Sequence, residues 1–458
     1  MASSPTAVAD LIANPAGHAG PATLAAAEPG SAGSESSREP FFPHEPSTLE
    51  ETGLALSDVE GLVLKLLLTH GAVTGRRMAD QLRLPFGLMN DLLGVLRKEH
   101  LLGICGQAPM GDFQYDLTDE GRSRARWYAE RCTYCGAAPV PLAAYVASVQ
   151  QQSARRAGVK LPNLCRALED LILPPALLSQ LGQAMHAGRG LLLYGQPGNG
   201  KTSIAERLVR ALPEPIWIPR TITVTGEIIR LFDPANHEEL PLETPHGALL
   251  DSVPHDRRWV RIRRPLIVLG GELRMEQLEI AHNPATGILE ATVQLKSNGG
   301  VLVVDDFGRQ KCSTAELLNR WIVPLEKGFD FLSLPSGRQI QVPFEQLLVF
   351  STNLPPQQLV DEAFLRRIAY KIEVADPSPR EFKELCQLWA QRLGLECRPE
   401  AIEHLLVRHF GEGGRPMRYC HPRDLMLQVR AFCEFNDLPP VVTAKAIDVA
   451  VKNYFGGL

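Results

Sequence analysis

Four residues near the middle of the chain have the types and the spacing of a phosphate-binding loop. Gly195, Gly200, Lys201 and Thr202 match the pattern G-x-x-x-x-G-K-[ST], in which backbone N–H groups surround phosphates at a helix N-terminus. Lys201 is expected to reach the β- and γ-phosphates of a nucleoside triphosphate, and Thr202 is expected to coordinate Mg²⁺. The chemistry that these residues predict is binding of a nucleoside triphosphate through its phosphates.

The segments that flank this loop decide whether the pattern is meaningful, because ordinary glycine-rich loops match it by chance. Residues 191–194 are a short apolar run, which is typical of a buried parallel strand. After the loop, Ile204, Ala205 and Leu208 repeat at helical spacing. The sequence therefore predicts a strand, a phosphate loop and a helix in direct succession.

A second apolar run, VLVVDD, ends in the carboxylates Asp305 and Asp306. At the end of a strand beside the loop, Asp305 is expected to face the magnesium ion and Asp306 to orient a water toward the γ-phosphate. Glutamate is commoner at the second position, and aspartate is one methylene shorter, so slow hydrolysis is one expectation. Asn353 ends a further strand, FEQLLVFSTN, where its amide is expected to contact the γ-phosphate or the attacking water.

Two consecutive arginines, Arg366 and Arg367, precede the last predicted strand of this region. Such a pair also occurs in surface salt bridges. We predict instead that it supplies an arginine finger, which stabilises the charge of a γ-phosphate during transfer.

These motifs together resemble the AAA+ ATPase family from about Leu164 to the C-terminus. Walker A (GQPGNGKT), Walker B (VLVVDD), sensor 1 (STN), the finger (FLRR) and sensor 2 (HPRDL) follow one another in the family's order. The nucleotide-binding residues that the resemblance implies are Gly195, Gln196, Pro197, Gly198, Asn199, Gly200, Lys201, Thr202, Ser203 and Arg423. It implies Thr202 and Asp305 for Mg²⁺, and Asp306, Asn353, Arg367 and Arg366 for catalysis.

The segment FDFLSLPSGRQIQV is expected to form a hairpin before sensor 1. It resembles the pre-sensor-1 insertion of the branch that contains MoxR-type ATPases, magnesium chelatases and enhancer-dependent transcription activators. The activators' GAFTGA-like loop and an aromatic pore loop are not found, so the client-facing part is expected within residues 236–298. A second hairpin is predicted with its turn at Gly270-Gly271.

Composition places the chain among ordinary globular proteins. It has 458 residues, 45% of them hydrophobic and 22% charged, and a net charge of −5, which gives no global attraction to nucleic acid. No apolar stretch is long enough to span a membrane. Nine cysteines favour reduced thiols and a cytoplasmic location. For the close pair Cys132 and Cys135, we favour packing or surface cysteines over a metal site.

The chain divides into five predicted regions with an α/β fold class. These are a disordered tail (1–50), a winged-helix domain (51–130), a linker (131–163), an AAA+ core built on a parallel P-loop sheet (164–375) and a helical lid (376–458). Residues 55–130 resemble the winged helix-turn-helix domains of bacterial regulators. The wing, residues 103–114, has no Lys or Arg, and phosphate contacts need cations. We therefore favour protein contact or packing over DNA binding, and both alternatives stay open.

The expected function is a magnesium-dependent AAA+ ATPase that remodels a macromolecular partner, with a protein client favoured. The resemblance implies a homo-oligomeric ring, for example a hexamer. One alternative is a regulator that the winged helix directs to DNA. Another is a nucleotide-dependent switch that scarcely turns over, which the aspartate at position 306 keeps open.

Overall fold

A computed structural model describes residues 40–154, 158–188, 190–213, 215–242, 254–359, 365–412 and 414–456. Of the predicted tail, residues 1–39 lie outside the described residues. Residues 40–50 include the start of a short helix, α1 (Leu49–Thr52), whose N-terminus the Thr48 hydroxyl caps. The Phe41 ring lies 5.2 Å from the ring of Trp259, so this part of the predicted tail packs against residues far along the chain.

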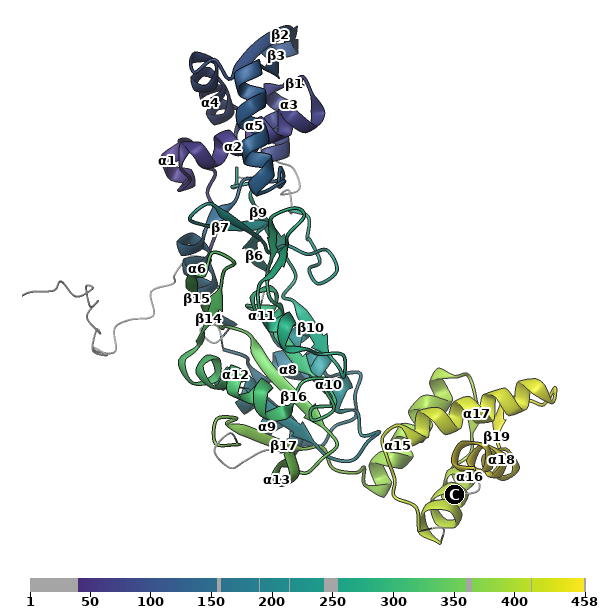
Figure 1. Cartoon of the computed structure of the whole chain (residues 1–458). Helices are drawn as coiled ribbons and strands as arrows, with labels where there is room; N and C mark the ends of the chain where they lie inside the picture. The colour runs from purple at the N-terminus through teal and green to yellow at the C-terminus, as the bar shows by residue number, and fades with distance from the viewer. Residues whose placement is uncertain are drawn as a thin grey trace, which may run out of the picture. The chain divides into compact units, whose positions relative to one another are not determined.

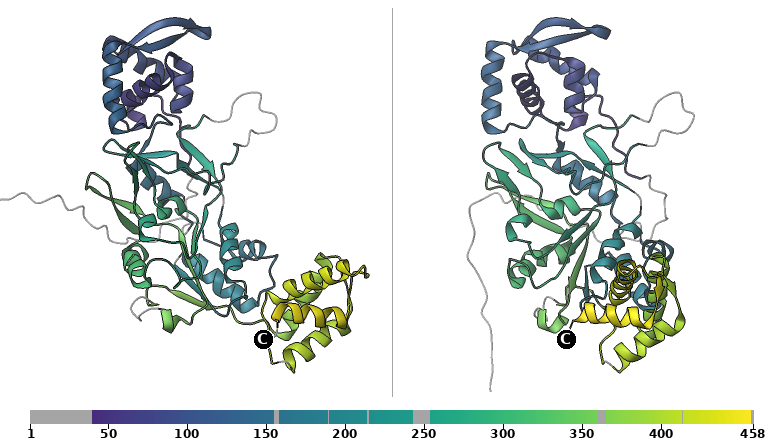
Figure 2. Two further views of the ribbon diagram at one scale, coloured as in Figure 1. Left: turned by 45° about the vertical axis from the view of Figure 1, so that its right-hand side comes forward. Right: turned by 90° about the vertical axis from the view of Figure 1, so that its right-hand side faces the viewer.

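The N-terminal domain contains three helices followed by a two-stranded ribbon and a fourth helix, the order expected for residues 51–130. Leu62, Leu66, Met89 and Leu93 are among the buried residues that form its core. The ribbon projects beyond the helices of this domain (Figure 2). Its elements are α2 (Leu56–His70), β1 (Val73–Thr74), α3 (Gly75–Leu82), α4 (Phe86–Lys98), β2 (Leu102–Ala108), β3 (Asp112–Leu117) and α5 (Asp119–Arg131), with the antiparallel strand order β1-β3-β2.

The region predicted as a linker, residues 131–163, supplies a strand and a helix to a second sheet. The Tyr145 side chain is fully buried, and its hydroxyl accepts a hydrogen bond from the Asn298 amide at 2.9 Å. The strand order of this sheet is β11-β12-β8-β7-β4. The elements are β4 (Val140–Pro141), α6 (Leu142–Gln151), β7 (Thr221–Val224), β8 (Glu227–Arg230), β11 (Ala281–Asn283) and β12 (Ile288–Glu290), beside the antiparallel pair β6 (Ile216–Pro219) and β9 (Trp259–Ile262).

The central sheet has five strands in the order β10-β13-β16-β5-β17, and every pairing in it is parallel. The strands are β5 (Leu191–Tyr194), β10 (Leu266–Leu269), β13 (Val301–Val304), β16 (Leu347–Thr352) and β17 (Tyr370–Glu373). Strands covered on both faces read as continuous apolar runs, which is why VLVV and LLVF were recognisable in the sequence. The predicted α/β fold class with a parallel sheet is confirmed.

Helices cover both faces of the central sheet (Figure 1). Leu191 and Leu193 pack with one group of helices, and Leu192 between them packs with Trp321 on the other face, as the alternation of side chains along a strand requires. The helices are α8 (Leu161–Ala167), α9 (Pro175–Ala187), α10 (Lys201–Arg207) and η2 (Leu208–Ala211) on the first face, and α12 (Thr314–Lys327) on the second.

Of the two predicted hairpins, one is confirmed and one is wrong. β14 (Phe329–Ser333) and β15 (Gln339–Pro343) form the antiparallel hairpin that precedes β16. Gly270-Gly271 is not a hairpin turn, because β10 pairs in parallel with β13 and is followed by the short helix η3 (Met275–Leu278). The described part of residues 236–298 also includes the short helix α11 (Val293–Ser297) and strands of both large sheets.

The described residues of the predicted lid, 376–412 and 414–456, form a compact helical body with its own core, in which Phe382, Ile402, Phe410 and Val429 are buried. Its elements are α15 (Pro379–Arg392), β18 (Glu396–Cys397), α16 (Pro399–His404), the π-helix η4 (Leu405–Gly411), α17 (His421–Phe435), β19 (Val441–Val442) and α18 (Ala444–Phe455). The short helix α13 (Pro356–Leu359) precedes β17. None of the helices described in the structure combines the length and the apolar character needed to cross a membrane.

Candidate nucleotide-binding site

The predicted phosphate loop joins β5 to α10 and depends on glycines with positive φ angles. Gly195, Gly198 and Gly200 have φ angles of 140°, 86° and 80°, which side-chain-bearing residues rarely adopt. A Cβ atom on Gly195 would lie 2.4 Å from the Val374 carbonyl oxygen. Glycine is therefore required at this position by both the backbone conformation and the close approach of the chain beyond β17.

The strand order brings the predicted residues to one edge of the central sheet. β5 lies between β16 and β17, although the chain passes through β10 and β13 before it returns beside β5. Ligands of open parallel sheets bind at the carboxyl ends of strands where the strand order reverses in this way. The phosphate loop, Asp305 and Asn353 follow the carboxyl ends of β5, β13 and β16, so all three meet at this edge.

The Lys201 ammonium group lies between the phosphate loop and Asn353. Its Nζ donates hydrogen bonds to the carbonyl oxygens of Gly195 at 3.0 Å and Gln196 at 2.9 Å, and to Asn353 Oδ1 at 2.8 Å. Only 5% of the residue is exposed. Burial lowers the pKa of Lys201, while the nearby carboxylates act in the opposite direction. The carbonyl oxygens of the phosphate loop and the Asn353 side chain thus hold the Lys201 cation in place.

Thr202 and Asp305 form the second contact of the site. The Thr202 hydroxyl lies 3.0 Å and 2.9 Å from the two carboxylate oxygens of Asp305. A hydroxyl and a carboxylate supply the oxygen ligands that Mg²⁺ prefers, and Mg²⁺ usually completes its octahedral shell with waters and substrate phosphates. The donor set of these two side chains fits magnesium.

Asp306 is joined to Lys201 through Asn353. Asn353 Nδ2 donates to Asp306 Oδ1 at 3.2 Å, while its Oδ1 accepts from Lys201. Asp306 has a φ of 48°, an uncommon value for a residue with a side chain. The Gln310 amide donates to the carbonyl oxygens of Asp305 and Asp306 at 2.9 Å and 3.2 Å, and sequence reasoning did not identify Gln310.

The lid contacts the phosphate loop directly through residues 418–420. The Cys420 N–H donates to the Gly198 carbonyl oxygen at 2.9 Å. Asn199 Nδ2 donates to Asp376 Oδ1 at 2.7 Å, and Arg418 forms an ion pair with the same carboxylate. Asp376 and Arg418 were not predicted, because neither residue type nor spacing distinguishes them from other charged residues of the lid.

The loop, the carboxylates and the lid line one pocket of about 530 Å³. Arg423 also lines it, and Arg423 Nε donates to Asp424 Oδ1 at 2.8 Å. The predicted residues that line the pocket are Pro197, Gly198, Asn199, Gly200, Lys201, Thr202, Ser203, Asp305, Asp306, Asn353 and Arg423. Gly195 and Gln196 contribute the carbonyl oxygens that hold Lys201.

Arg366 and Arg367 lie elsewhere in the chain. Both line a different pocket of about 560 Å³, together with Gly190 and Leu348, which stand at the amino ends of β5 and β16. Arg367 Nε lies 2.5 Å from Glu326 Oε1. The structure therefore does not bring the two arginines to the phosphate loop of their own chain.

Comparisons with known proteins give one family match and a set of distant structural likenesses. The family model Domain of unknown function (DUF8689) matches residues 378–453, which lie within the lid. No curated protein matches the chain. The similar solved structures include the Thermotoga maritima RuvB Holliday junction branch migration motor, with 15% identity, a TM-score of 0.36 and coverage of 62% of this chain and 71% of RuvB.

A mutant of the same RuvB has 15% identity and a TM-score of 0.37, with coverage of 62% of this chain and 72% of that one. NtrX from Brucella abortus, solved in complex with ATP, has 13% identity and a TM-score of 0.37, with coverage of 63% of this chain and 64% of NtrX. Likenesses at this level of identity and TM-score do not assign a function to this chain.

Proposed function

We propose that this protein is a magnesium-dependent AAA+ ATPase that couples ATP hydrolysis to the remodelling of a macromolecular partner. The observation that carries the proposal is the continuous contact from Lys201 through Asn353 to Asp306, beside the pair formed by Thr202 and Asp305. A fixed cation, an oxygen ligand set for Mg²⁺ and a carboxylate for the attacking water are the parts that phosphoryl transfer to water needs.

Each residue has a specific role in this proposal. The phosphates of ATP would replace the carbonyl oxygens as acceptors for the Lys201 ammonium group. Thr202 and Asp305 would hold Mg²⁺, which supplies charge neutralisation on the phosphates when bound. Asp306 would orient water, and Asn353 would hold that water or the γ-phosphate. Arg423 and apolar pocket residues such as Leu171 and Trp389 would enclose the rest of the nucleotide.

Asp306→Asn is expected to bind ATP normally and to hydrolyse it at least about 100-fold more slowly, because a positioned acid or base contributes about 10²–10⁴-fold. The asparagine keeps the size of the side chain and removes its basicity. Phosphate release and fluorescent-nucleotide titration measure the two effects separately. Asp305→Asn is the matched control and should raise the Mg²⁺ concentration that hydrolysis requires, because it removes an anionic ligand of the ion. Equal hydrolysis by Asp306→Asn and the parent protein would remove Asp306 from the chemistry.

We propose a homo-oligomeric ring, for example a hexamer, with a protein client and a cytoplasmic location. The Arg367 pocket lies at the amino ends of the central strands, whereas the phosphate loop lies at their carboxyl ends, and this arrangement supports a site shared between subunits. The nine free cysteines fit a reducing compartment. In the same proposal, the β14–β15 hairpin is the pre-sensor-1 insertion, and the winged-helix domain is the adaptor for the client.

A DNA-directed regulator is the alternative function, supported by the helices and ribbon of the N-terminal domain. We expect weak DNA binding, because residues 103–114 contain no Lys or Arg and the Arg76 guanidinium stacks 4.4 Å from the ring centre of Phe86, at the start of α4. A gel shift of the full chain at two salt concentrations measures this. Tight binding that falls steeply as salt rises would favour the DNA-directed alternative.

A further inference from the structure

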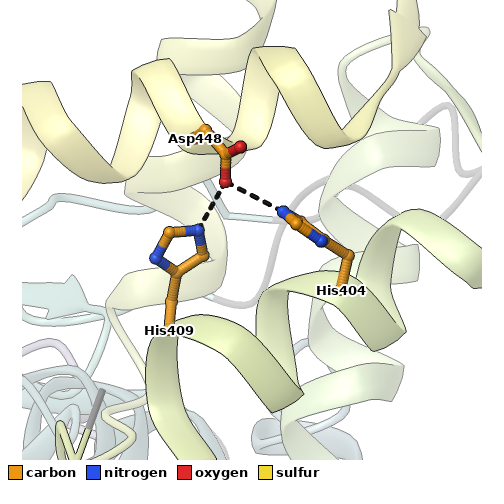
Figure 3. Close-up of side chains that lie close together, drawn as sticks. All are labelled: His404, His409 and Asp448. Atoms are coloured by element: carbon orange, nitrogen blue, oxygen red, sulfur yellow. Dashed lines mark hydrogen bonds and ion pairs between the residues drawn. The ribbon is translucent and has the colours of Figure 1, made fainter. Parts of the chain in front are cut away.

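Two histidines and an aspartate meet inside the lid (Figure 3), and none of the three lines the nucleotide pocket. His404 is the last residue of α16, His409 lies in η4, and Asp448 lies in α18. The Nε2 atoms of His404 and His409 lie 2.9 Å and 2.7 Å from Asp448 Oδ1. All three side chains are partly buried, with exposed fractions of 24%, 14% and 37%.

The π-helix explains why the two histidines share a face. Residues five apart in an α-helix point about 140° away from each other, because the helix has 3.6 residues per turn. η4 has the wider π turn over Leu405–Gly411, which brings His409 back beside His404, and π segments often occur at functional sites. The buried side chains of Ile402, Phe410 and Ile447 hold this turn against α18.

We propose that His404, His409 and Asp448 bind one divalent transition-metal cation of the Zn²⁺ type. Two imidazoles and a carboxylate are the ligand set of three-residue zinc sites, which leave a further coordination position for water or another ligand. One ligand atom from each side chain lies within 4.8 Å of the other two. This site differs in chemistry from the pair Thr202 and Asp305, which offers only oxygen atoms.

The ligands need only a small movement to accept the ion. Metal–ligand bonds of about 2.1 Å in tetrahedral geometry separate the ligand atoms by about 3.4 Å, whereas the present N–O distances are 2.9 Å and 2.7 Å. Rotation of partly exposed side chains can supply that difference. Arg408 NH1 stands 3.8 Å from Asp448 Oδ2, and its side chain is 61% exposed, so it is free to turn toward solvent.

A metal-free, hydrogen-bonded cluster is the competing state of the same three side chains. When each imidazole carries its proton on Nε2, both N–H groups donate to Asp448, and the cluster is satisfied without an ion. For a cation to bind at Nε2, each neutral imidazole would carry its proton on Nδ1 instead, so that the Nε2 lone pairs and the Asp448 carboxylate are available to the cation. The bound cation then joins the α16–η4 segment to α18 within the lid by metal–ligand bonds.

The first test is Zn²⁺ titration of the reduced, chelator-treated full chain by isothermal calorimetry. The parent protein should bind one more equivalent of Zn²⁺ than the double variant His404→Gln/His409→Gln, or bind it at least about 100-fold more tightly, because loss of an outer partner alone costs about 10- to 100-fold. His282→Gln, at an exposed position in β11, is the matched control and should equal the parent. Any Zn²⁺ that cysteines bind should be the same in the parent and in both variants, so it does not change the comparison.

The second test uses the parent protein, so it does not depend on the folding of a variant. Zn²⁺ should protect His404 and His409, but not His282, from diethylpyrocarbonate, as read by mass spectrometry of peptides. Co²⁺ bound at this site should show d–d absorption without the intense thiolate charge-transfer band that cysteine ligands produce. Identical Zn²⁺ binding by parent and double variant, or modification of His404 and His409 that Zn²⁺ does not change, would overturn the proposal.

Discussion

Lys201→Ala is expected to weaken ATP binding by at least about 100-fold. The Lys201 ammonium group makes three hydrogen bonds at 2.8–3.0 Å at the edge of the sheet, and ATP would take over some of these bonds through its phosphates. Each hydrogen bond that involves a charged group contributes about 1.5–3 kcal/mol, and about 1.4 kcal/mol corresponds to a tenfold change in affinity. Loss of two such bonds therefore gives a change of about 10²–10⁴-fold.

Titration with a fluorescent ATP analogue measures this loss. Lys371→Ala is the matched control, because Lys371 is an exposed lysine on the neighbouring strand β17 and should leave the affinity unchanged. Lys201→Met keeps most of the length of the side chain without its charge, and it should behave as Lys201→Ala does. A folded Lys201→Ala protein with the affinity of the parent would contradict the phosphate-loop assignment.

Arg367→Ala is expected to bind ATP normally and to lose at least about 10³-fold in hydrolysis, because an arginine finger contributes about 10³–10⁵-fold. Arg367 lies at the amino ends of the sheet strands, whereas the phosphate loop lies at their carboxyl ends. Its expected target is therefore the site of an adjoining subunit. The rate of hydrolysis per chain should also rise with protein concentration as subunits assemble.

Mixing two inactive proteins separates a shared site from a structural role. Arg367→Ala retains a complete phosphate loop, and Lys201→Ala retains the finger, so their mixture should recover part of the parental rate. Glu326→Gln is the control for the ion pair with Arg367 and should cost much less than Arg367→Ala. Arg366→Ala is tested in parallel as the other candidate. If no mixture recovers activity and turnover per chain is independent of concentration, the ring proposal fails.

The central sheet could be predicted because its signals are local. The run 191–194, the loop after it and the apolar strand before Asp305 each combine a hydrophobic pattern with a motif only a few residues away. Contacts such as that between Thr202 and Asp305, 103 residues apart, then follow from the rule that carboxyl ends of parallel strands share one edge. The α/β class followed from this reasoning without knowledge of the strand order.

The second sheet was not predicted because its strands are short and pair with distant segments. β4 has only two residues and pairs with β7, about 80 residues later. The real two-residue turn is Thr225-Gly226 between β7 and β8, with φ angles of 48° and 86°, as type I′ hairpin turns require. The hairpin prediction at Gly270-Gly271 was wrong because two adjacent glycines match the pattern of a hairpin turn, whereas β10, the strand before them, pairs in parallel with β13.

The contacts that the lid makes could not be predicted from the sequence either. The amphipathic pattern predicted helices, but not the π turn that brings His404 and His409 together. No motif predicts the contact between Cys420 and Gly198 either. A Cβ atom added to Gly198 would lie 2.6 Å from the Cys420 sulfur. Both features depend on how the helices pack in three dimensions.

The most direct test of the central claim is phosphate release from ATP by the full chain, with Mg²⁺ and after chelation of Mg²⁺. The account predicts release that requires Mg²⁺ and that is lost in Lys201→Ala, in parallel with the loss of ATP binding. Release that continues unchanged without Mg²⁺ or in Lys201→Ala would contradict the assignment of the site. ATP binding without release at any protein concentration would contradict the ATPase proposal and leave the nucleotide-dependent switch.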